Sequence, residues 1–406
     1  MRFLVVAPRL FYPTDTGGKI RSARLFEELA RLHDITMVAF RSPHETEEQV
    51  RAMRACSSRL ETIPRPEYKK GSLAFLYAVS RAFFSPHDYT VARYYDARME
   101  RRVRELLADG SYDILLCDFL QTTLNVISVD FRPRIVFQHN VEAVVRKRQY
   151  RQARNPITKS YLYLEWYKRW RYEKYVSNAF DHNIMVSETD RRIVATEYGA
   201  HNASAIPTAV DSQFFAPRRP DVDGNHIVFT GSMDWLPNQD GITWFVQDVL
   251  PRITSKVGAT LWIVGRNPTR KIRRLSQRNS NVEVTGTVDD VRPYIARASV
   301  YVVPLRVGSG TRIKIFEAMA MEKAVVSTSI GAEGLPVTSG ENIVLADEPQ
   351  AFAEAVVQLI KLPSMRSGLG QRARRMVREN YTWEVAARRF SAICQEAAAR
   401  ATQPAY

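Results

Sequence analysis

The strongest indication of the fold lies in residues Pro304 to Leu335, which read PLRVGSGTRIKIFEAMAMEKAVVSTSIGAEGL. Two apolar, β-branched runs, Ala298 to Val303 before it and Ala324 to Ser327 within it, have the composition of buried strands. Between them we expect a glycine turn at Gly308 and a helix from Thr311 to Met321. Strand, glycine loop, helix and strand together form half of a nucleotide-binding α/β unit.

The start of this helix suits a phosphate group. Glycines let the backbone approach a ligand closely, and a helix N-terminus presents unpaired N–H groups and a partial positive charge. Arg312 and Lys314 add full positive charge there, although a solvated helix start is the alternative interpretation. Glu317 follows nearly two turns in, where a carboxylate can accept from a ribose diol. The donor-binding turn that we predict consists of Gly308, Ser309, Gly310 and Thr311.

The motif Gly308-x-Gly-Thr-Arg-x-Lys-x-x-Glu-Ala-Met-Ala, followed by Val325-Val326-Ser-Thr and Gly331-Ala-Glu-Gly, resembles the family-4 (group 1) glycosyltransferases. The closest resemblance is to their bacterial exopolysaccharide-type sugar transferases. It implies the GT-B fold, with two Rossmann-like α/β domains facing a central cleft and a terminal helix crossing back to the first domain. It also implies transfer of sugar from a nucleotide donor with retention at the anomeric carbon.

One position departs from the family pattern. The family carries two glutamates eight positions apart, and Glu317 matches the second of them. Ser309 stands where the first would fall, so the carboxylate that usually touches the donor sugar is missing.

Length and composition are those of a two-domain globular protein. The chain has 406 residues, 45% of them hydrophobic and 25% charged. We expect an acceptor-side Rossmann-like domain over residues 1–206, joined by the terminal helix 384–406, a proline-bounded linker over 207–217, and a donor domain over 218–383. No apolar run reaches the ~20 residues of a membrane helix, and the N-terminus has the pattern of a first strand rather than a signal peptide. Three scattered cysteines favour a cytoplasmic protein.

The net charge of +15 indicates an anionic partner, such as nucleotide phosphates, an acidic membrane or nucleic acid, or else simply a basic solvated surface. Residues 141–175 hold ten basic and three acidic side chains with interleaved Tyr and Trp. This mixture within 146–175 suits an anionic lipid surface at the inner face of the cell membrane. The alternative is a long helix whose stripe Tyr163-Trp166-Tyr167-Trp170 packs on its own domain while the charges face water. No nucleic-acid-binding module is recognisable.

Two further features fall in the first domain. Gly17 and Gly18 follow the first apolar strand and open a helix in which Arg21 adds charge. By itself a glycine pair indicates only a turn, but the resemblance implies a position near the donor phosphates and the acceptor. His139 follows the strand Ile135 to Phe137, at the edge of the sheet where α/β proteins collect functional side chains. His139-Asn-Val-Glu matches the family histidine that hydrogen-bonds the donor sugar.

The second domain begins with a strand that runs into Gly231 and Ser232. Many family members place an arginine immediately after this glycine and a lysine a few residues later, both for the diphosphate, and this chain has neither. The diphosphate charge must therefore be met by Arg266, which follows another strand, or by Arg312 and Lys314, which we favour.

We therefore interpret the chain as a retaining hexosyltransferase that moves a sugar from a nucleotide-diphosphate sugar to a glycan or lipid-linked acceptor, with Arg312 and Lys314 stabilising the leaving group and His139 orienting the sugar. No cofactor or metal is expected, because the sequence shows no ligand cluster. A glycoside hydrolase is disfavoured, since the pattern is phosphate-binding rather than two facing acids. A nucleotide-sugar epimerase of the same fold, or an inactive membrane-associated scaffold, are the alternatives.

Overall fold

The computed structural model describes residues 1–67, 71–153, 155–218, 225–307 and 312–401. The described chain divides into two compact units, one of Met1–Pro207 with Ala386–Tyr406 and the other of Thr208–Val385. Each unit is a parallel β-sheet covered by helices on both faces, the arrangement of a Rossmann-like domain. In the part of the chain that the structure describes, no helix has the length and apolar character needed to cross a bilayer.

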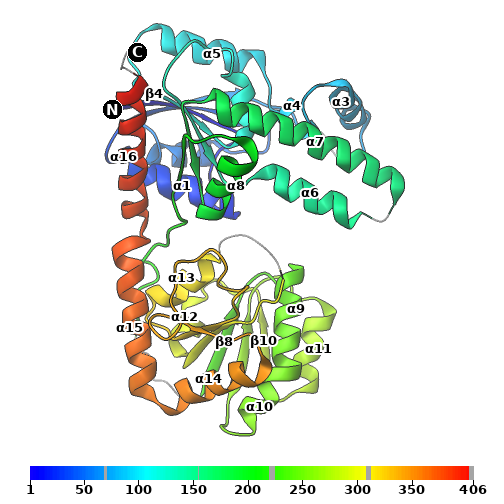
Figure 1. The fold of residues 1–406 in the computed structure, drawn as a ribbon, viewed down its shortest axis with the longest axis vertical. Helices are drawn as coiled ribbons and strands as arrows, with labels where there is room; N and C mark the ends of the chain where they lie inside the picture. The colour runs from blue at the N-terminus through cyan, green and yellow to red at the C-terminus, as the bar shows by residue number, and fades with distance from the viewer. Residues whose placement is uncertain (68–70, 154, 219–224, 308–311, 402–406) are drawn as a thin grey trace. The chain divides into compact units, whose positions relative to one another are not determined.

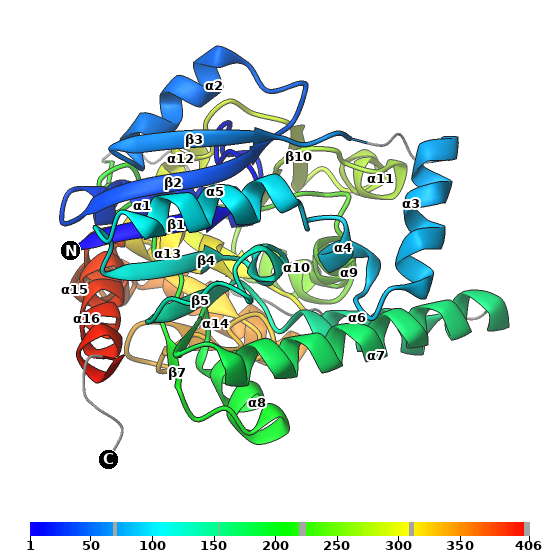
Figure 2. The same cartoon turned by 90° about the horizontal axis from the view of Figure 1, so that it is seen from above.

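The first sheet has seven strands in the order β3-β2-β1-β4-β5-β6-β7 (Figure 2). The direction of crossover reverses between β1 and β4, which is the place where open α/β sheets bind ligands. The strands are β1 (Arg2–Ala7), β2 (Asp34–Arg41), β3 (Arg59–Pro64), β4 (Ile114–Asp118), β5 (Arg134–Gln138), β6 (His182–Met185) and β7 (Ala203–Ala205).

Helices connect these strands, and the terminal helix belongs to the same unit. They are α1 (Gly17–Ala30), α2 (Glu47–Ala52), η1 (Met53–Ala55), α3 (Leu73–Phe84), α4 (Tyr89–Ala92), α5 (Ala97–Ala108), η2 (Leu120–Asn125), α6 (Glu142–Gln152), α7 (Pro156–Ala179), α8 (Glu188–Tyr198) and α16 (Trp383–Ala401). On α16, the Phe390 ring packs edge-on against Phe137 of β5, with 5.4 Å between centroids, and Ser391 lies 2.8 Å from the His33 ring nitrogen. The chain therefore returns to its first unit, as the resemblance implied.

The second sheet has six strands in the order β10-β9-β8-β11-β12-β13, so its crossover direction reverses between β8 and β11. Its strands are β8 (His226–Thr230), β9 (Thr260–Val264), β10 (Val282–Gly286), β11 (Val300–Val303), β12 (Val325–Ser327) and β13 (Val344–Leu345). Its helices are α9 (Leu236–Trp244), η3 (Phe245–Val249), α10 (Leu250–Thr254), α11 (Arg270–Arg278), α12 (Arg292–Arg297), α13 (Ile313–Ala320), α14 (Pro349–Lys361) and α15 (Pro363–Asn380).

The basic aromatic segment, residues 141–175, falls on two helices, α6 and α7, and the burial on α7 differs from the expectation that its aromatic stripe packs inward. The side of α7 that faces the first unit carries charged side chains, and Lys168, Arg169 and Glu173 are all buried. Tyr163 and Tyr167 are instead 49% and 41% exposed. The expectation that the tyrosines pack inward while the charges face water is therefore wrong for these residues, because the buried charges have partners on other elements.

Those partners fix α3 and α4 to α7. The Lys168 ammonium donates to the carbonyls of Ala82 and Phe83 at 3.0 and 2.7 Å, in the last turn of α3, where a positive charge also suits the negative end of the helix dipole. The Arg169 guanidinium pairs with Asp88 at 2.6 Å. In Figures 1 and 2, α3, α6 and α7 accordingly lie together at the end of the first unit opposite α16.

Candidate functional site

In the second unit, the backbones of two glycines come into close contact beside the switch point of the sheet. Gly231 follows β8, and Gly265 follows the neighbouring strand β9. A Cβ on Gly265 would lie 1.9 Å from the carbonyl oxygen of Gly231, so no side chain fits at this position. A Cβ on Gly231 would come within 3.0 Å of the Lys314 ammonium and 2.7 Å of the Asn238 amide. The Gly231 backbone therefore lies directly against the two polar groups that form the base of the site.

Lys314 is the centre of the candidate site in the second unit. Its ammonium, on the first turn of α13, donates to the Thr230 carbonyl at 2.8 Å and to the Asn238 amide oxygen at 3.1 Å. Both acceptors are neutral, and an ammonium has three hydrogens to donate. Burial, reinforced by the nearby Arg312, lowers the Lys314 pKa to about 7. An anion bound here would pair with the Lys314 ammonium and favour its charged form, because burial makes that form costly in the free protein.

Arg312 and Glu317 flank Lys314 along the same helix. Arg312 is buried, its guanidinium carbon lies 5.2 Å from the centre of the Trp235 ring, and burial lowers its pKa. Burial also raises the pKa of Glu317 to about 7, against the opposing effect of Lys314. Among the described residues, none donates a hydrogen bond to the Glu317 carboxylate. Arg312 immediately precedes the first residue of α13, and Glu317 is the fifth residue of that helix, one turn beyond Lys314. Their roles stay predictions. Gly308, Ser309, Gly310 and Thr311 lie outside the described residues.

Ser232 and Arg266 meet on the other side of the Gly231 turn. The Arg266 Nε donates to the Ser232 hydroxyl at 3.0 Å, and the Met233 amide donates to the Arg266 carbonyl at 2.8 Å. Asp234 accepts from Ser232 and, at 2.9 Å, from Asn267. Arg266 thus has a carboxylate close by, whereas the hydrogen bonds of Lys314 go to neutral oxygens. This contrast favours Lys314 over Arg266 as the principal phosphate contact.

In the first unit, the glycine pair opens α1 against an aromatic ring. A Cβ on Gly18 would lie 3.0 Å from the Phe119 ring and 3.3 Å from the Arg9 guanidinium, whereas one on Gly17 would meet nothing within 4 Å. Phe119 has a φ of 68°, a backbone conformation that is costly for a bulky residue. Its ring stacks on His139 with 3.7 Å between centroids and 8° between planes. Gly18 therefore leaves room for the ring that fixes the plane of His139.

His139 is held by charged partners. Its Nε2 lies 2.9 Å from Asp118 Oδ1, and the other Asp118 oxygen accepts from the Ser22 hydroxyl at 2.8 Å. Its Nδ1 lies 3.5 Å from Arg21 Nη1. Because the guanidinium can only donate, this network assigns the ring proton to Nε2 and the lone pair to Nδ1. Burial lowers the pKa of His139, although Asp118 opposes the shift, so the ring is neutral at pH 7.

Several residues of the candidate sites in the two units were not found by the sequence analysis. Asp118, Ser22 and Phe119 surround His139 but lie 20 to 117 residues from it along the chain, and Asn238 supports Lys314 from 76 residues away. The signal that could have found Asp118 is its position at the carboxyl end of a strand next to the switch point. Asn238, in the first turn of α9, looks like an ordinary helix residue.

Two sequence profiles match the chain in series. "Glycosyltransferase Family 4" matches residues 16–214, and "Glycosyl transferases group 1" matches residues 224–362. Together they span both units. The chain belongs to the family-4, group 1 glycosyltransferases.

Full-length relatives agree with this assignment. The glycosyltransferase is 23% identical to an uncharacterised 44.6 kDa protein of the cps region of Klebsiella pneumoniae, over 94% of this chain and 96% of that one. It is also 23% identical to phosphatidyl-myo-inositol mannosyltransferase of Mycolicibacterium smegmatis, over 95% and 91% of the two chains. Its fold matches Anabaena Alr3699/HepE, solved in complex with UDP, with a TM-score of 0.67 at 13% identity, covering 98% of this chain and all of that one. The fold of the glycosyltransferase is therefore GT-B.

Proposed function

We propose that this glycosyltransferase binds a nucleotide-diphosphate sugar in its second unit and transfers the sugar, with retention, to a glycan or lipid-linked acceptor in bacterial polysaccharide synthesis. The observation that carries the proposal is Lys314, a buried ammonium whose hydrogen bonds go only to neutral oxygens among the described residues. A diphosphate against the Gly231 turn would supply the missing negative charge. Negative charge grows on that group as the glycosidic bond to the donor breaks, so Lys314 and Arg312 would stabilise the transition state more than the ground state.

Glu317 has a separate role in this proposal. Its carboxylate lies one turn beyond Lys314 on α13 and receives no hydrogen bond from any described residue, so a ribose diol can donate to it. A diol that replaced the lost solvation would favour the ionised carboxylate and bring its raised pKa down. The relative solved with UDP has a nucleotide of this kind.

His139 is proposed to orient the transferred sugar. With the ring proton committed to Asp118, the atom of the ring that can meet a ligand is Nδ1, which accepts. A sugar hydroxyl would then donate to His139, competing with the long contact to Arg21. Because the buried ring is neutral, it acts in this proposal as a positioning group rather than as a general acid.

We further propose that the outer face of α6 and α7, within residues 146–175, meets an anionic membrane surface at the inner face of the cell membrane. Ile157 and Tyr175 are 82% and 58% exposed on α7, among basic side chains such as Lys159 and Lys174. Flotation with vesicles of phosphatidylglycerol tests this surface. Binding only to anionic vesicles supports it, and equal or no binding to neutral and anionic vesicles contradicts it.

The donor site is tested by thermal unfolding against UDP, GDP, ADP and their sugars. A ligand at about a hundred times its dissociation constant adds ~2.7 kcal/mol to the folded state, which shifts the midpoint visibly. We expect one nucleotide to give a shift that Glu317→Gln reduces. The control Glu354→Gln, on the exposed surface of α14, should leave the shift unchanged. No shift with any nucleotide would contradict the proposed function.

A further inference from the structure

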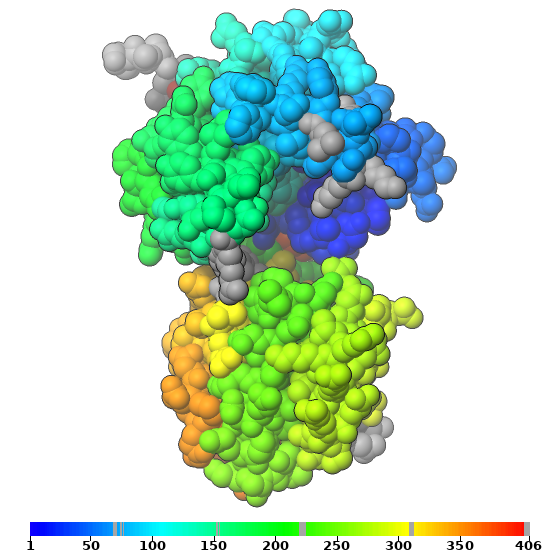
Figure 3. Space-filling model, turned by 90° about the vertical axis from the view of Figure 1, so that its right-hand side faces the viewer, coloured from blue at the N-terminus to red at the C-terminus, as the bar shows by residue number. Residues whose placement is uncertain are grey.

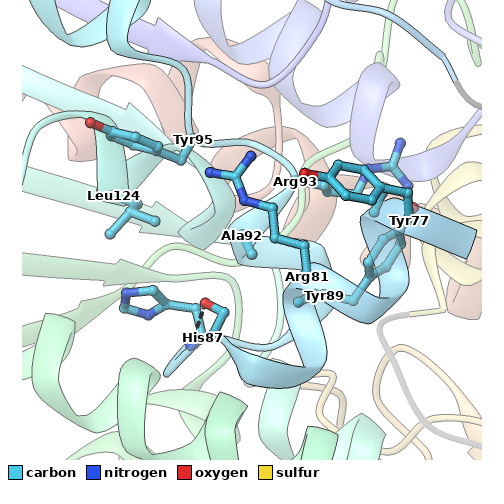
Figure 4. A pocket seen from close by; sticks show the side chains of 11 residues that line it. Tyr77, Arg81, His87, Tyr89, Ala92, Arg93, Tyr95 and Leu124 are labelled. Atoms are coloured by element: carbon cyan, nitrogen blue, oxygen red, sulfur yellow. Dashed lines mark hydrogen bonds between the residues drawn. The ribbon is translucent and has the colours of Figure 1, made fainter. Parts of the chain in front are cut away.

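A pocket of about 300 Å³ opens in the first unit between α3, α4 and η2. Its lining combines tyrosine rings with two guanidinium groups, those of Arg81 and Arg93, and none of the residues that line it is acidic. In Figure 4, the Arg81 side chain rises between Tyr95 on one side and Tyr77 with Arg93 on the other. This composition is suited to an anionic group carried by a molecule with apolar or sugar surface.

The two arginines have no carboxylate partner in the part of the chain that the structure describes. Neither Arg81 nor Arg93 forms an ion pair with any residue that the structure describes. Arg93 instead lies over two aromatic rings, 5.6 Å from the centre of Tyr89 and 5.4 Å from that of Tyr94. Acidic residues near the pocket are already committed, since Asp88 pairs with Arg169 and Glu165 accepts from the Tyr89 amide at 3.0 Å. The pocket therefore holds two positive charges that have no ion-pair partner among the residues described by the structure.

The helix beside the pocket is apolar on its outer face. Arg81 is the only charged residue of α3, which reads LAFLYAVSRAFF. Leu73, Tyr77 and Phe84 are 86%, 68% and 85% exposed. Together with Arg81 they recur at helical spacing, so they lie along one stripe. In Figure 3, α3 (blue) and α6–α7 (green) lie next to each other on one face of the first unit. An apolar stripe thus leads directly into a cationic pocket.

The pocket and α3 are joined to α7 by hydrogen bonds, and they lie near His139. Lys168 and Arg169 of α7 fix the end of α3 and the start of α4. Leu124, which lines the pocket, belongs to η2, and η2 begins immediately after Phe119, the residue stacked on His139. A six-residue 3₁₀ segment spans about 12 Å. A head group in the pocket would therefore lie within the length of a few sugar rings of His139.

We propose that this pocket binds the phosphate-bearing head group of an amphiphilic acceptor whose hydrocarbon chain lies along Leu73, Tyr77 and Phe84. The inference rests on the proposed function, because it names the acceptor class of the same transfer reaction. Arg81 and Arg93 hold the phosphate, the tyrosine rings flank the first sugar, and the growing glycan extends towards His139.

Calorimetric titration with farnesyl diphosphate below its micelle concentration tests this site. The background variant is Lys314→Met, so that the diphosphate does not bind in the second unit. We expect farnesyl diphosphate to bind more tightly than either farnesol or inorganic diphosphate. Arg81→Gln and Arg93→Gln should each weaken it about tenfold, the lower end of what a charge-assisted hydrogen bond contributes. Phe84→Ser should weaken it as well.

Matched controls are Arg101→Gln and Leu32→Ser, an exposed arginine on α5 and a half-exposed leucine beyond α1, which should change nothing. Farnesol or inorganic diphosphate binding as tightly as farnesyl diphosphate would overturn the inference, as would equal affinities in the arginine variants. Loss of flotation on phosphatidylglycerol vesicles in Arg81→Gln with unchanged farnesyl diphosphate binding would also overturn it, in favour of a bilayer contact. Nucleotide shifts in the otherwise wild-type protein are measured separately, so failure of the donor site and failure of this pocket are distinguishable.

Discussion

Lys314 in the second unit donates hydrogen bonds to two neutral oxygens, whereas His139 in the first unit lies between a carboxylate and a guanidinium. Both residues sit beside the switch point of a parallel sheet and below a glycine turn. In the second unit the Lys314 ammonium has no anionic hydrogen-bond partner among the described residues, so it favours an anionic ligand. In the first unit the charges compensate one another, so the network fixes geometry instead. The two positions are therefore suited to different tasks, binding a phosphate and orienting a sugar.

The largest expected effect comes from removing the uncompensated charge. Lys314→Met should weaken binding of the preferred nucleotide about a hundredfold at pH 6.5, because hydrogen bonds to a charged group contribute about 1.5–3 kcal/mol. The substitution removes a buried charge but also takes one donor from the Thr230 and Asn238 oxygens, so urea unfolding of the variant is measured beside its affinity. Calorimetry measures the affinity, with Asp118→Asn as the variant expected to bind normally. An unchanged affinity in Lys314→Met would contradict the proposal that Lys314 binds phosphate.

A second experiment addresses the compensated network. Asp118→Asn should lower kcat about tenfold to a hundredfold while leaving nucleotide affinity unchanged, because small misplacements of an orienting group cost this much. The asparagine can turn its amide towards His139 and donate, which would demand the other tautomer of the ring. Steady-state kinetics with the nucleotide sugar that the thermal-unfolding experiment selects gives kcat and KM separately. A parallel loss of nucleotide binding would show that the first unit does not act through geometry alone.

The pH dependence of nucleotide affinity tests whether Lys314 must be protonated to bind the phosphate. Burial lowers the Lys314 pKa to about 7, and a bound phosphate favours the charged form, so the complex holds a proton that the free protein loses above that pH. Deprotonation of Lys314 should then lower the affinity by up to about tenfold per pH unit between pH 7 and 9. Subtracting the profile of Lys314→Met removes the titration of the nucleotide itself and offsets that of Glu317, whose raised pKa has the opposite effect on affinity. A difference profile that is flat, or that rises with pH, would contradict this role.

The smallest effect compares two adjacent glycines. Gly18→Ala places a methyl group against the Phe119 ring and should destabilise the fold by about 1–2 kcal/mol, as overpacking usually does. Gly17→Ala meets open space at the first turn of α1 and should be neutral or stabilising by about 0.5 kcal/mol. Urea unfolding of both variants measures the difference. Equal effects on the free energy of unfolding would contradict the conclusion that Gly18 is needed to make room for the Phe119 ring.

The predicted strands and helices fail mostly where periodicity is weak. The pattern predicts one surface helix over Thr46 to Ser58, but α2 and η1 end at Ala55 and β3 follows at Arg59. This edge strand is only half-buried and shows no clean alternation of apolar and polar residues. On α7, the pattern cannot predict buried charges, because their partners, Ala82, Phe83 and Asp88, lie about 80 residues earlier in the chain.

The two-sheet α/β architecture could be predicted from local patterns, because strands, glycine turns and helix starts depend on neighbouring residues. The family motif adds the candidate residues Arg312, Lys314, Glu317 and His139, whose roles stay predictions. The partner of each side chain becomes known only from the folded chain. Asp118 orients His139, Asn238 supports Lys314, and the cationic pocket joins α3 to η2. Such contacts join elements from distant parts of the chain, and packing alone brings them within hydrogen-bonding distance.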